Sequence, residues 1–94
     1  MTVVGKPDLE IYGMTHAETQ RPLAAWLKIV EDAKWTSLVD VRKTRPDADY
    51  VKPYTVFNIK GNKYRLITKI NYKIQLASIE NFMTHAEYSK GGWK

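Results

Sequence analysis

The spacing of hydrophobic residues changes from a helical period to a strand period in the middle of the chain, which restricts it to folds that combine helices with a sheet. In the first half, hydrophobic residues recur at positions i, i+3, i+4 and i+7, and this pattern predicts an amphipathic helix over residues 20–34. The residues concerned are Leu23, Trp26, Leu27, Val30 and Ala33. In the second half, residues 56–60 and 63–67 alternate around Gly61-Asn62, which predicts a β-hairpin. The chain is therefore expected to fold as an α+β protein.

The predicted hairpin has a two-residue turn of type II′, with Gly61 at its first central position. This turn pairs Val56 with Ile67, Asn58 with Arg65 and Lys60 with Lys63 on one face, and Phe57 with Leu66 and Ile59 with Tyr64 on the other. The second face is apolar and is expected to pack on the helix. The first face gathers Asn58, Lys60, Lys63, Arg65 and Lys69. Because like charges opposite one another destabilise a sheet, Lys60 and Lys63 need solvent or an anion beside them, which indicates a phosphate site.

Several shorter elements are predicted in addition. They are an edge strand over residues 2–4, a short helix from Pro7 to near Gly13, a short helix that begins at Ser37 and stops before Pro46, a loop over residues 47–49, a third strand over residues 76–82 and a terminal helix capped by Thr84. We expect a small antiparallel sheet of three to four strands with the N-terminal helices packed on one face. At this length the chain is expected to form one domain, residues 1–94.

The composition excludes several classes of protein. The 94 residues include no cysteine, which rules out disulfides, thiolate metal sites and cysteine nucleophiles. No apolar run approaches the roughly 20 residues that span a bilayer, and the first residues lack the pattern of a signal peptide. A cytoplasmic location without a membrane partner is therefore expected.

The net charge of +5 lies in one segment of the chain. Residues 50–79 carry six basic side chains and no acidic one, namely Lys52, Lys60, Lys63, Arg65, Lys69 and Lys73. Aromatic residues are interleaved with them, at Tyr50, Tyr54, Phe57, Tyr64 and Tyr72. Basic side chains among aromatic ones suit single-stranded RNA, which offers phosphates and bases that can stack. A solvated sheet face with ordinary surface charges is the alternative.

The five residues Met-Thr-His-Ala-Glu occur twice, at residues 14–18 and 83–87. No similarity extends beyond the five-mer, so chance is the preferred interpretation over duplication. The two His-x-Glu pairs have neither the H-E-x-x-H spacing nor a cysteine, which makes them a weak signal for zinc. No metal and no cofactor are expected, and His16 is interpreted as structural.

Residues 57–67, Phe-Asn-Ile-x-Gly-Asn-Lys-Tyr-Arg-Leu-Ile, resemble the HigB toxins of the RelE-like superfamily of type II toxin-antitoxin systems. The likeness continues at residues 70–72, Ile-Asn-Tyr, and at residues 84–88, Thr-His-Ala-Glu-Tyr. In the helical half it rests on Pro22-Leu23, Trp26, Ala33-x-Trp35 and Asp40-Val41-Arg42, so that it covers roughly residues 20–88. The resemblance implies a small α+β toxin that cleaves mRNA, usually on the ribosome. It also implies a HigA-like helix-turn-helix antitoxin, encoded by an adjacent gene, as the partner that silences it.

Metal-independent RNA cleavage uses the 2′-hydroxyl as nucleophile and leaves a 2′,3′-cyclic phosphate and a 5′-hydroxyl. It needs a base, an acid and positive charge near the phosphate. His85 is the candidate acid or base, because an imidazole exchanges protons near neutral pH; a capping or packing histidine is the alternative. Arg65 is the candidate for stabilising the transition state, because its planar guanidinium matches phosphate oxygens; a solvated strand arginine is the alternative.

Tyr88 and Glu87 complete the candidate catalytic set. Tyr88 is expected to stack a base or donate a proton, or else to be a core aromatic. Glu87 is expected to orient His85 or act as the base, or else to form a surface ion pair. The candidate RNA-binding residues are Asn58, Lys60, Lys63, Lys69 and Lys94, of which the lysines would contact the RNA backbone.

Three positions depart from the family pattern, namely Ser78 and Glu80 on the last strand and Ser89 after the His-Ala-Glu-Tyr run. If Glu80 shares a face with Arg65, its charge repels phosphate and weakens the nuclease. The sequence therefore leaves two other functions open. One is an inactive relative that binds RNA or ribosomes without cutting, and the other is an interaction domain for a partner chain.

Overall fold

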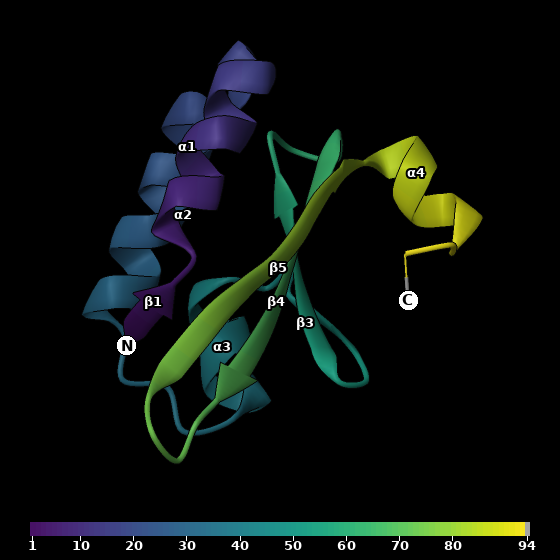
Figure 1. Cartoon of the computed structure of the whole chain (residues 1–94). Helices are drawn as coiled ribbons and strands as arrows, with labels where there is room; N and C mark the ends of the chain where they lie inside the picture. Colours follow the sequence, from purple (N-terminus) through teal and green to yellow (C-terminus); the bar gives the residue numbers. More distant parts are fainter. Residues whose placement is uncertain (94) are drawn as a thin grey trace.

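The computed structural model describes residues 1–93 and contains four α-helices and five strands (Figure 1). The helices are α1 (Lys6–Thr15), α2 (Gln20–Asp32), α3 (Leu38–Thr44) and α4 (His85–Lys90), with a short 3₁₀ helix, η1 (Ala17–Thr19), before α2. The strands are β1 (Thr2–Val4), β2 (Asp49–Val51), β3 (Tyr54–Ile59), β4 (Tyr64–Asn71) and β5 (Leu76–Thr84). No helix within residues 1–93 has both the length and the apolar character needed to cross a membrane.

The strands form one sheet in the order β1-β5-β4-β3-β2, with β1 parallel to β5 and the other neighbours antiparallel. The α+β class is confirmed. The predicted sheet of three to four antiparallel strands was too small, and its purely antiparallel pairing was wrong. The edge strand predicted over residues 2–4 is β1. The strand that the sequence missed is β2, because its three residues are too few to show a clear strand period and it starts inside the segment predicted as a loop. In Figure 1, α1 and α2 stand to the left of the sheet and α4 to its right.

The β3–β4 hairpin has the predicted register, because Asn58 pairs with Arg65 and Ile59 with Tyr64. The turn differs from the prediction. Lys60 and Gly61 have positive φ angles of 57° and 63°, so β3 already ends at Ile59. The Lys63 N–H donates to the Lys60 carbonyl at 3.2 Å. The two lysines therefore belong to the turn and do not form the opposed strand pair that the sequence predicted.

Buried apolar side chains lie on both faces of the sheet. On one face, Trp26 of α2 is fully buried and its ring meets the ring of Phe57 edge-on, 5.4 Å between centroids. On the opposite face, Val56, Ile67 and Met83 form a smaller cluster. We call this opposite face the Arg65 face, and its residues are Val56, Asn58, Arg65, Ile67, Lys69, Ser78, Asn81 and Met83. Its centre is therefore apolar, as the predicted pairing of Val56 with Ile67 on this face implies, and Met83 of β5 adds to it.

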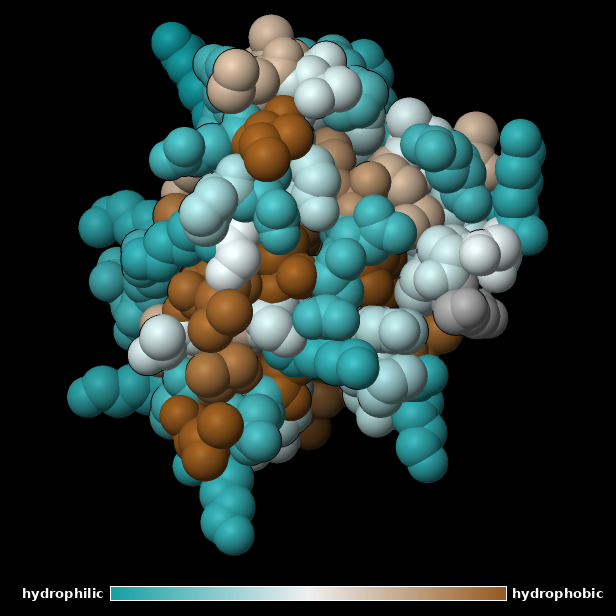
Figure 2. Space-filling model, viewed as in Figure 1, coloured by the Kyte–Doolittle hydropathy of each residue, from teal (hydrophilic) through white to brown (hydrophobic). Residues whose placement is uncertain are grey.

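Exposed hydrophobic residues gather at one end of the β4–β5 pair. Figure 2 shows a hydrophobic band over β1 and the turn that joins β4 to β5. Val4 and Ile74, which are 49% and 62% exposed, belong to these segments. Arg65 and His85 lie at the other end of the pair, where Tyr64 is opposite Thr84.

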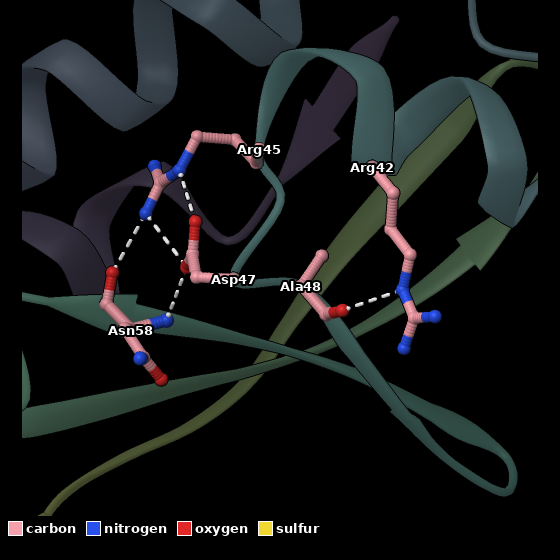
Figure 3. Close-up of polar contacts among 5 residues, drawn as sticks. All are labelled: Arg42, Arg45, Asp47, Ala48 and Asn58. Carbon is pink, nitrogen blue, oxygen red and sulfur yellow. Dashed lines mark hydrogen bonds and ion pairs between the residues drawn. The ribbon is translucent and has the colours of Figure 1, made fainter.

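A hydrogen-bonded network fixes the connection from α3 to the sheet (Figure 3). The Arg45 guanidinium donates to both carboxylate oxygens of Asp47, at 2.9 and 3.1 Å, and to the Asn58 carbonyl at 2.7 Å. The Asn58 N–H in turn donates to Asp47 at 2.9 Å. Burial tends to raise the pKa of the Asp47 carboxyl, but the hydrogen bonds from Arg45 and Asn58 outweigh it and lower this pKa overall.

The Asp47→Asn variant is expected to lower the free energy of unfolding by about 1–3 kcal/mol at pH 7, because it removes the charged acceptor of three hydrogen bonds. The folded-state pKa of Asp47 lies below the unfolded one, so this stabilisation exists above the unfolded pKa and is lost as the pH falls through the folded one. Urea unfolding at neutral and acidic pH measures both effects. Asp49→Asn is the control, because the Asp49 side chain is 63% exposed, and a change within about 0.5 kcal/mol is expected. Equal losses in the two variants would contradict the prediction.

Candidate functional site

Arg65 and His85 meet where β4 begins and β5 passes into α4. An Arg65 Nη2 hydrogen points to His85 Nδ1, with the nitrogens 2.9 Å apart. The position of His85 is fixed by its backbone, since its N–H donates to the Lys63 carbonyl at 2.8 Å. Thr84 caps α4 as predicted, because its hydroxyl accepts the Glu87 N–H at 3.2 Å. The hairpin turn and the helix cap thus hold the imidazole beside the guanidinium.

This contact determines which nitrogen of His85 carries the proton. A guanidinium has donors only, so Nδ1 must accept, and the neutral imidazole carries its hydrogen on Nε2. The His85 side chain is exposed, and within residues 1–93 the structure shows no hydrogen bond to Nε2. In this arrangement His85 presents an N–H donor to a ligand.

Arg65 is not the solvated strand arginine of the alternative interpretation, because only 8% of it is exposed. Its Nη1 donates to the carbonyls of Asn62 and Tyr64, both at 3.1 Å, and its Nη2 donates to Asn62 Oδ1 and His85. These four bonds use all four Nη hydrogens. A phosphate clamp, the predicted role, would require some of these bonds to be exchanged.

Tyr88 continues the site from Arg65 across the sheet. The Arg65 guanidinium lies over the Tyr88 ring, 5.4 Å from its centroid, and the Trp93 ring stacks on Tyr88 at 5.0 Å. Trp93 also contacts the ring of Tyr54 at 5.7 Å, and Lys69 Nζ lies 5.5 Å from the Tyr54 centroid. These five residues, Arg65, Tyr88, Trp93, Tyr54 and Lys69, form what we call the cation–aromatic chain. Burial raises the pKa of the Tyr88 phenol, so its hydroxyl stays protonated at neutral pH.

Tyr54 and Trp93 were not among the predicted site residues. Tyr54 belongs to the aromatic residues interleaved with the lysines, and this was its only sequence signal. Trp93 lies beyond the matched motifs and near the end of the chain, so its contact with Tyr88 depends on how the chain folds back after α4.

Glu87 is occupied by the helix cap. Its carboxylate accepts the Thr84 N–H at 3.0 Å, which completes the capping box with Thr84. Hydrogen bonds with the Thr84 backbone and hydroxyl lower the pKa of Glu87. Glu87 is therefore ionised at neutral pH and already engaged as an acceptor.

The predicted RNA-binding lysines do not all reach the Arg65 face. Lys63 Nζ lies 3.7 Å from Glu18 Oε2, and Glu18 also accepts the Tyr64 hydroxyl from the helix-bearing face. Lys60 is exposed in the turn, Asn58 is half-buried opposite Arg65, and Lys69 ends the cation–aromatic chain. The prediction for Lys94 falls outside the described residues. The prediction that Lys63 shares the Arg65 face was wrong, because the turn directs its side chain to Glu18.

Glu80 lies in a bulge of β5. Ile67 pairs with Asn81 and Thr68 with Ile79, which leaves Glu80 without a partner on β4. The Ser78 hydroxyl donates to Glu80 Oε2 at 2.9 Å, and Ser78 is opposite Lys69. The carboxylate is thus held at the Lys69 end of the Arg65 face, four strand positions, or about 13 Å, from Arg65.

The two five-mers lie on opposite faces of the start of β4. In the first copy, Glu18 accepts the Tyr64 hydroxyl, and His16 Nδ1 lies 3.4 Å from the same oxygen. In the second copy, His85 contacts Arg65, the next residue along the strand. Because Tyr64 and Arg65 are adjacent on β4, their side chains point to opposite faces of the sheet. The two copies of the five-mer therefore have different surroundings, one beside Tyr64 and the other beside Arg65.

The fold and this cluster define a small α+β protein with a basic and aromatic site at one end of its sheet. A family model described as HigB_toxin, the RelE-like toxic component of a toxin-antitoxin system, matches residues 19–91. This match spans most of the chain, including the β3–β4 hairpin, Arg65, His85 and Tyr88. The chain belongs to this family and is a RelE-like toxin, and membership implies an antitoxin partner. No match to a curated protein was found.

Proposed function

We propose that this toxin is an endoribonuclease that cleaves mRNA, on the ribosome or as free message, without a metal ion. The observation that carries the proposal is the Arg65–His85 contact, which holds an imidazole with its Nε2 open at the edge of a basic and aromatic face. Attack by the 2′-hydroxyl requires proton transfer and stabilisation of the negative charge on the phosphate. A positioned imidazole can provide the first and a guanidinium the second.

In the proposed reaction, the 2′-oxygen forms a bond to the phosphorus while the bond from phosphorus to the 5′-oxygen breaks. A proton leaves the 2′-hydroxyl and another reaches the 5′-oxygen, so the products are a 2′,3′-cyclic phosphate and a 5′-hydroxyl. His85 can accept or deliver a proton at Nε2 only when Nδ1 carries a hydrogen, and this requires Arg65 Nη2 to leave Nδ1. When the substrate binds, a phosphate oxygen replaces His85 Nδ1 as the acceptor of the hydrogen bond from Arg65 Nη2.

The other groups bind the substrate. The protonated hydroxyl of Tyr88 donates to a phosphate oxygen, because Arg65 and Trp93 already lie against its ring. Lys69 and Lys60 also contact phosphates. Glu87 acts by capping α4 and so positions His85. The antitoxin neutralises the toxin by covering the Arg65 face, or by keeping the Arg65 Nη2 hydrogen bond on His85 Nδ1 so that it cannot move to a phosphate oxygen.

The test is cleavage of a single-stranded RNA by the purified protein in buffer containing EDTA. The proposal expects fragments that end in 2′,3′-cyclic phosphates, and growth arrest in cells that is relieved by co-expression of the antitoxin. Fragments with 3′-hydroxyl ends, or activity that EDTA abolishes, would contradict the proposed mechanism.

A second candidate is a relative that binds RNA without cutting it. Two observations favour it: the Nη hydrogens of Arg65 are all engaged, and the Glu80 carboxylate sits at the Lys69 end of the face. RNA affinity that falls with added salt, together with mRNA that stays intact after long incubation both free and on ribosomes, would identify this function.

Glu80→Gln is expected to strengthen RNA binding about twofold to fivefold, because it removes one negative charge from the Arg65 face. Fluorescence anisotropy with a 2′-O-methyl RNA, which cannot be cleaved by 2′-hydroxyl attack, measures the affinity. Glu10→Gln, an exposed position on α1, makes the same change in net charge and should leave the affinity close to that of the wild type. Equal affinities for wild type and Glu80→Gln would show that RNA does not approach this end of the face.

A further inference from the structure

A cavity of about 390 Å³ lies between β5 and the segment that follows α4. It is lined by Asn81, Phe82 and Met83 of β5, by Glu87 and Lys90 of α4, and by Gly92 and Trp93. Its volume falls within the range of about 300–1,000 Å³ that is usual for small-molecule and cofactor sites. The roles assigned above to the Arg65–His85 pair do not use this cavity.

Two of its walls are fixed and apolar. The Trp93 ring is stacked on Tyr88 with an angle of 19° between the planes, and its Nε1 donates to the Tyr88 carbonyl at 3.1 Å. Met83 is buried, with 6% of its surface exposed. A flat aromatic wall and a thioether suit a planar aromatic ligand.

The cavity also has polar groups that match a nucleobase and its phosphate. Asn81 uses its Oδ1 to accept the Phe82 N–H at 2.8 Å, which leaves the two amide hydrogens on its Nδ2 as donors for a base edge. The Oε1 atom of Glu87 is used by the helix cap, and its second carboxylate oxygen, Oε2, is the acceptor for an exocyclic amine of a base. Lys90 is exposed and can reach a phosphate from the rim.

The same contacts disfavour a peptide strand as the occupant. The strand β1 covers only Leu76–Ser78, so within residues 1–93 the rest of this edge of β5 has no neighbouring strand. An added strand would need the backbone N–H groups of this edge. Those of Phe82 and Thr84 are already taken by the side chains of Asn81 and Glu87.

We propose that this cavity binds one base of the single-stranded RNA substrate, beside the nucleotides held at Arg65 and His85. The base packs against Trp93 and is selected by Asn81. Trp93 links the cavity to the catalytic pair, because it stacks on Tyr88, which lies against Arg65. This inference rests on the proposed function and adds to it a site that favours particular bases.

The experiment measures binding of a fluorescent 2′-O-methyl RNA of mixed sequence and of the four homopolymers. Trp93→Ala is expected to weaken binding by between about 5-fold and 100-fold, which is the usual effect of losing a base–aromatic stack. Trp93→Phe keeps an aromatic wall and is expected to retain most of the affinity. Asn81→Ala is expected to change the order of preference among the homopolymers and the positions of cleavage in natural RNA.

Asn71→Ala is the matched control for Asn81→Ala. Asn71 is also exposed, and its Oδ1 also accepts a nearby backbone N–H, that of Lys73, but it lies at the far end of β4. It should leave affinity and preference unchanged. Thermal melts establish whether each variant is folded.

A folded Trp93→Ala protein with wild-type affinity would overturn the inference. If Trp93→Ala does not fold, Asn81→Ala decides, and an unchanged base preference overturns the inference. Should the wild type cleave RNA while neither variant alters binding or cleavage positions, the cavity site is wrong and the proposed function stands. If the wild type neither binds nor cleaves RNA, both are wrong.

Discussion

Replacing His85 with alanine is expected to slow RNA cleavage by about 10²- to 10⁴-fold, the usual contribution of a positioned acid–base group. The change removes the imidazole that Arg65 holds at 2.9 Å. It deletes little buried surface, because His85 is exposed, so the melting temperature should stay close to that of the wild type. Single-turnover cleavage of a labelled RNA, with circular dichroism melts of the same samples, measures both quantities.

The repeated five-mer supplies the control for this variant. His16 has the same neighbours in sequence as His85 but contacts Tyr64 on the helix-bearing side. His16→Ala is expected to change the cleavage rate by no more than about twofold. A His85→Ala protein that cleaves within about tenfold of the wild-type rate would exclude His85 as the proton-transfer group.

Arg65→Lys is expected to lower kcat by about 10²-fold while changing KM little, because displacement of a catalytic group by about 1 Å has an effect of this size. Lysine keeps the positive charge. Its single ammonium group, on a flexible stem, cannot hold Asn62, Tyr64 and His85 together as the planar guanidinium does. The prediction is measured by steady-state kinetics and by ¹⁵N NMR of the His85 ring.

The NMR measurement separates positioning from simple structural support. In the wild type, the contact with Arg65 should give one neutral tautomer of His85, with the hydrogen on Nε2. In Arg65→Lys, a mixture of the two tautomers is expected. Arg21→Lys, the same substitution at an exposed position of α2, should leave kinetics and spectra unchanged. Wild-type kcat and a single tautomer in Arg65→Lys would show that Arg65 does not position His85.

The sequence predicted those parts of the site that depend on local geometry. The Gly61-Asn62 turn set the register that places Asn58 opposite Arg65, and Thr84 marked the start of α4. The sequence did not predict where Lys63 points. An alternating strand pattern assigns Lys63 to the Arg65 face, but Lys60 adopts a left-handed conformation, which ends β3 early and removes Lys63 from the alternation.

The sequence pattern also did not predict what surrounds the charged side chains of Arg65 and Glu80. Arg65 was expected at the surface among lysines. In the structure Tyr88 and His85 pack against it, and only 8% of its surface remains exposed. Glu80 could have faced either side, and the bulge opposite Ile67 and Thr68 places it beside Ser78. Such bulges arise from the fit between two strands, so one strand's sequence does not reveal them.

The sequence by itself determined the α+β class, the pairing of β3 with β4 and the presence of a basic, aromatic segment, because periodicity and turn chemistry act between near neighbours in the chain. Only the tertiary structure decided which side chains meet. His85 contacts Arg65 across 20 residues, and Tyr64 contacts Glu18 across 46. The cation–aromatic chain is likewise assembled from β3, β4, α4 and the residues after it. Contacts of this kind follow from how the elements pack, and no period in the sequence encodes them.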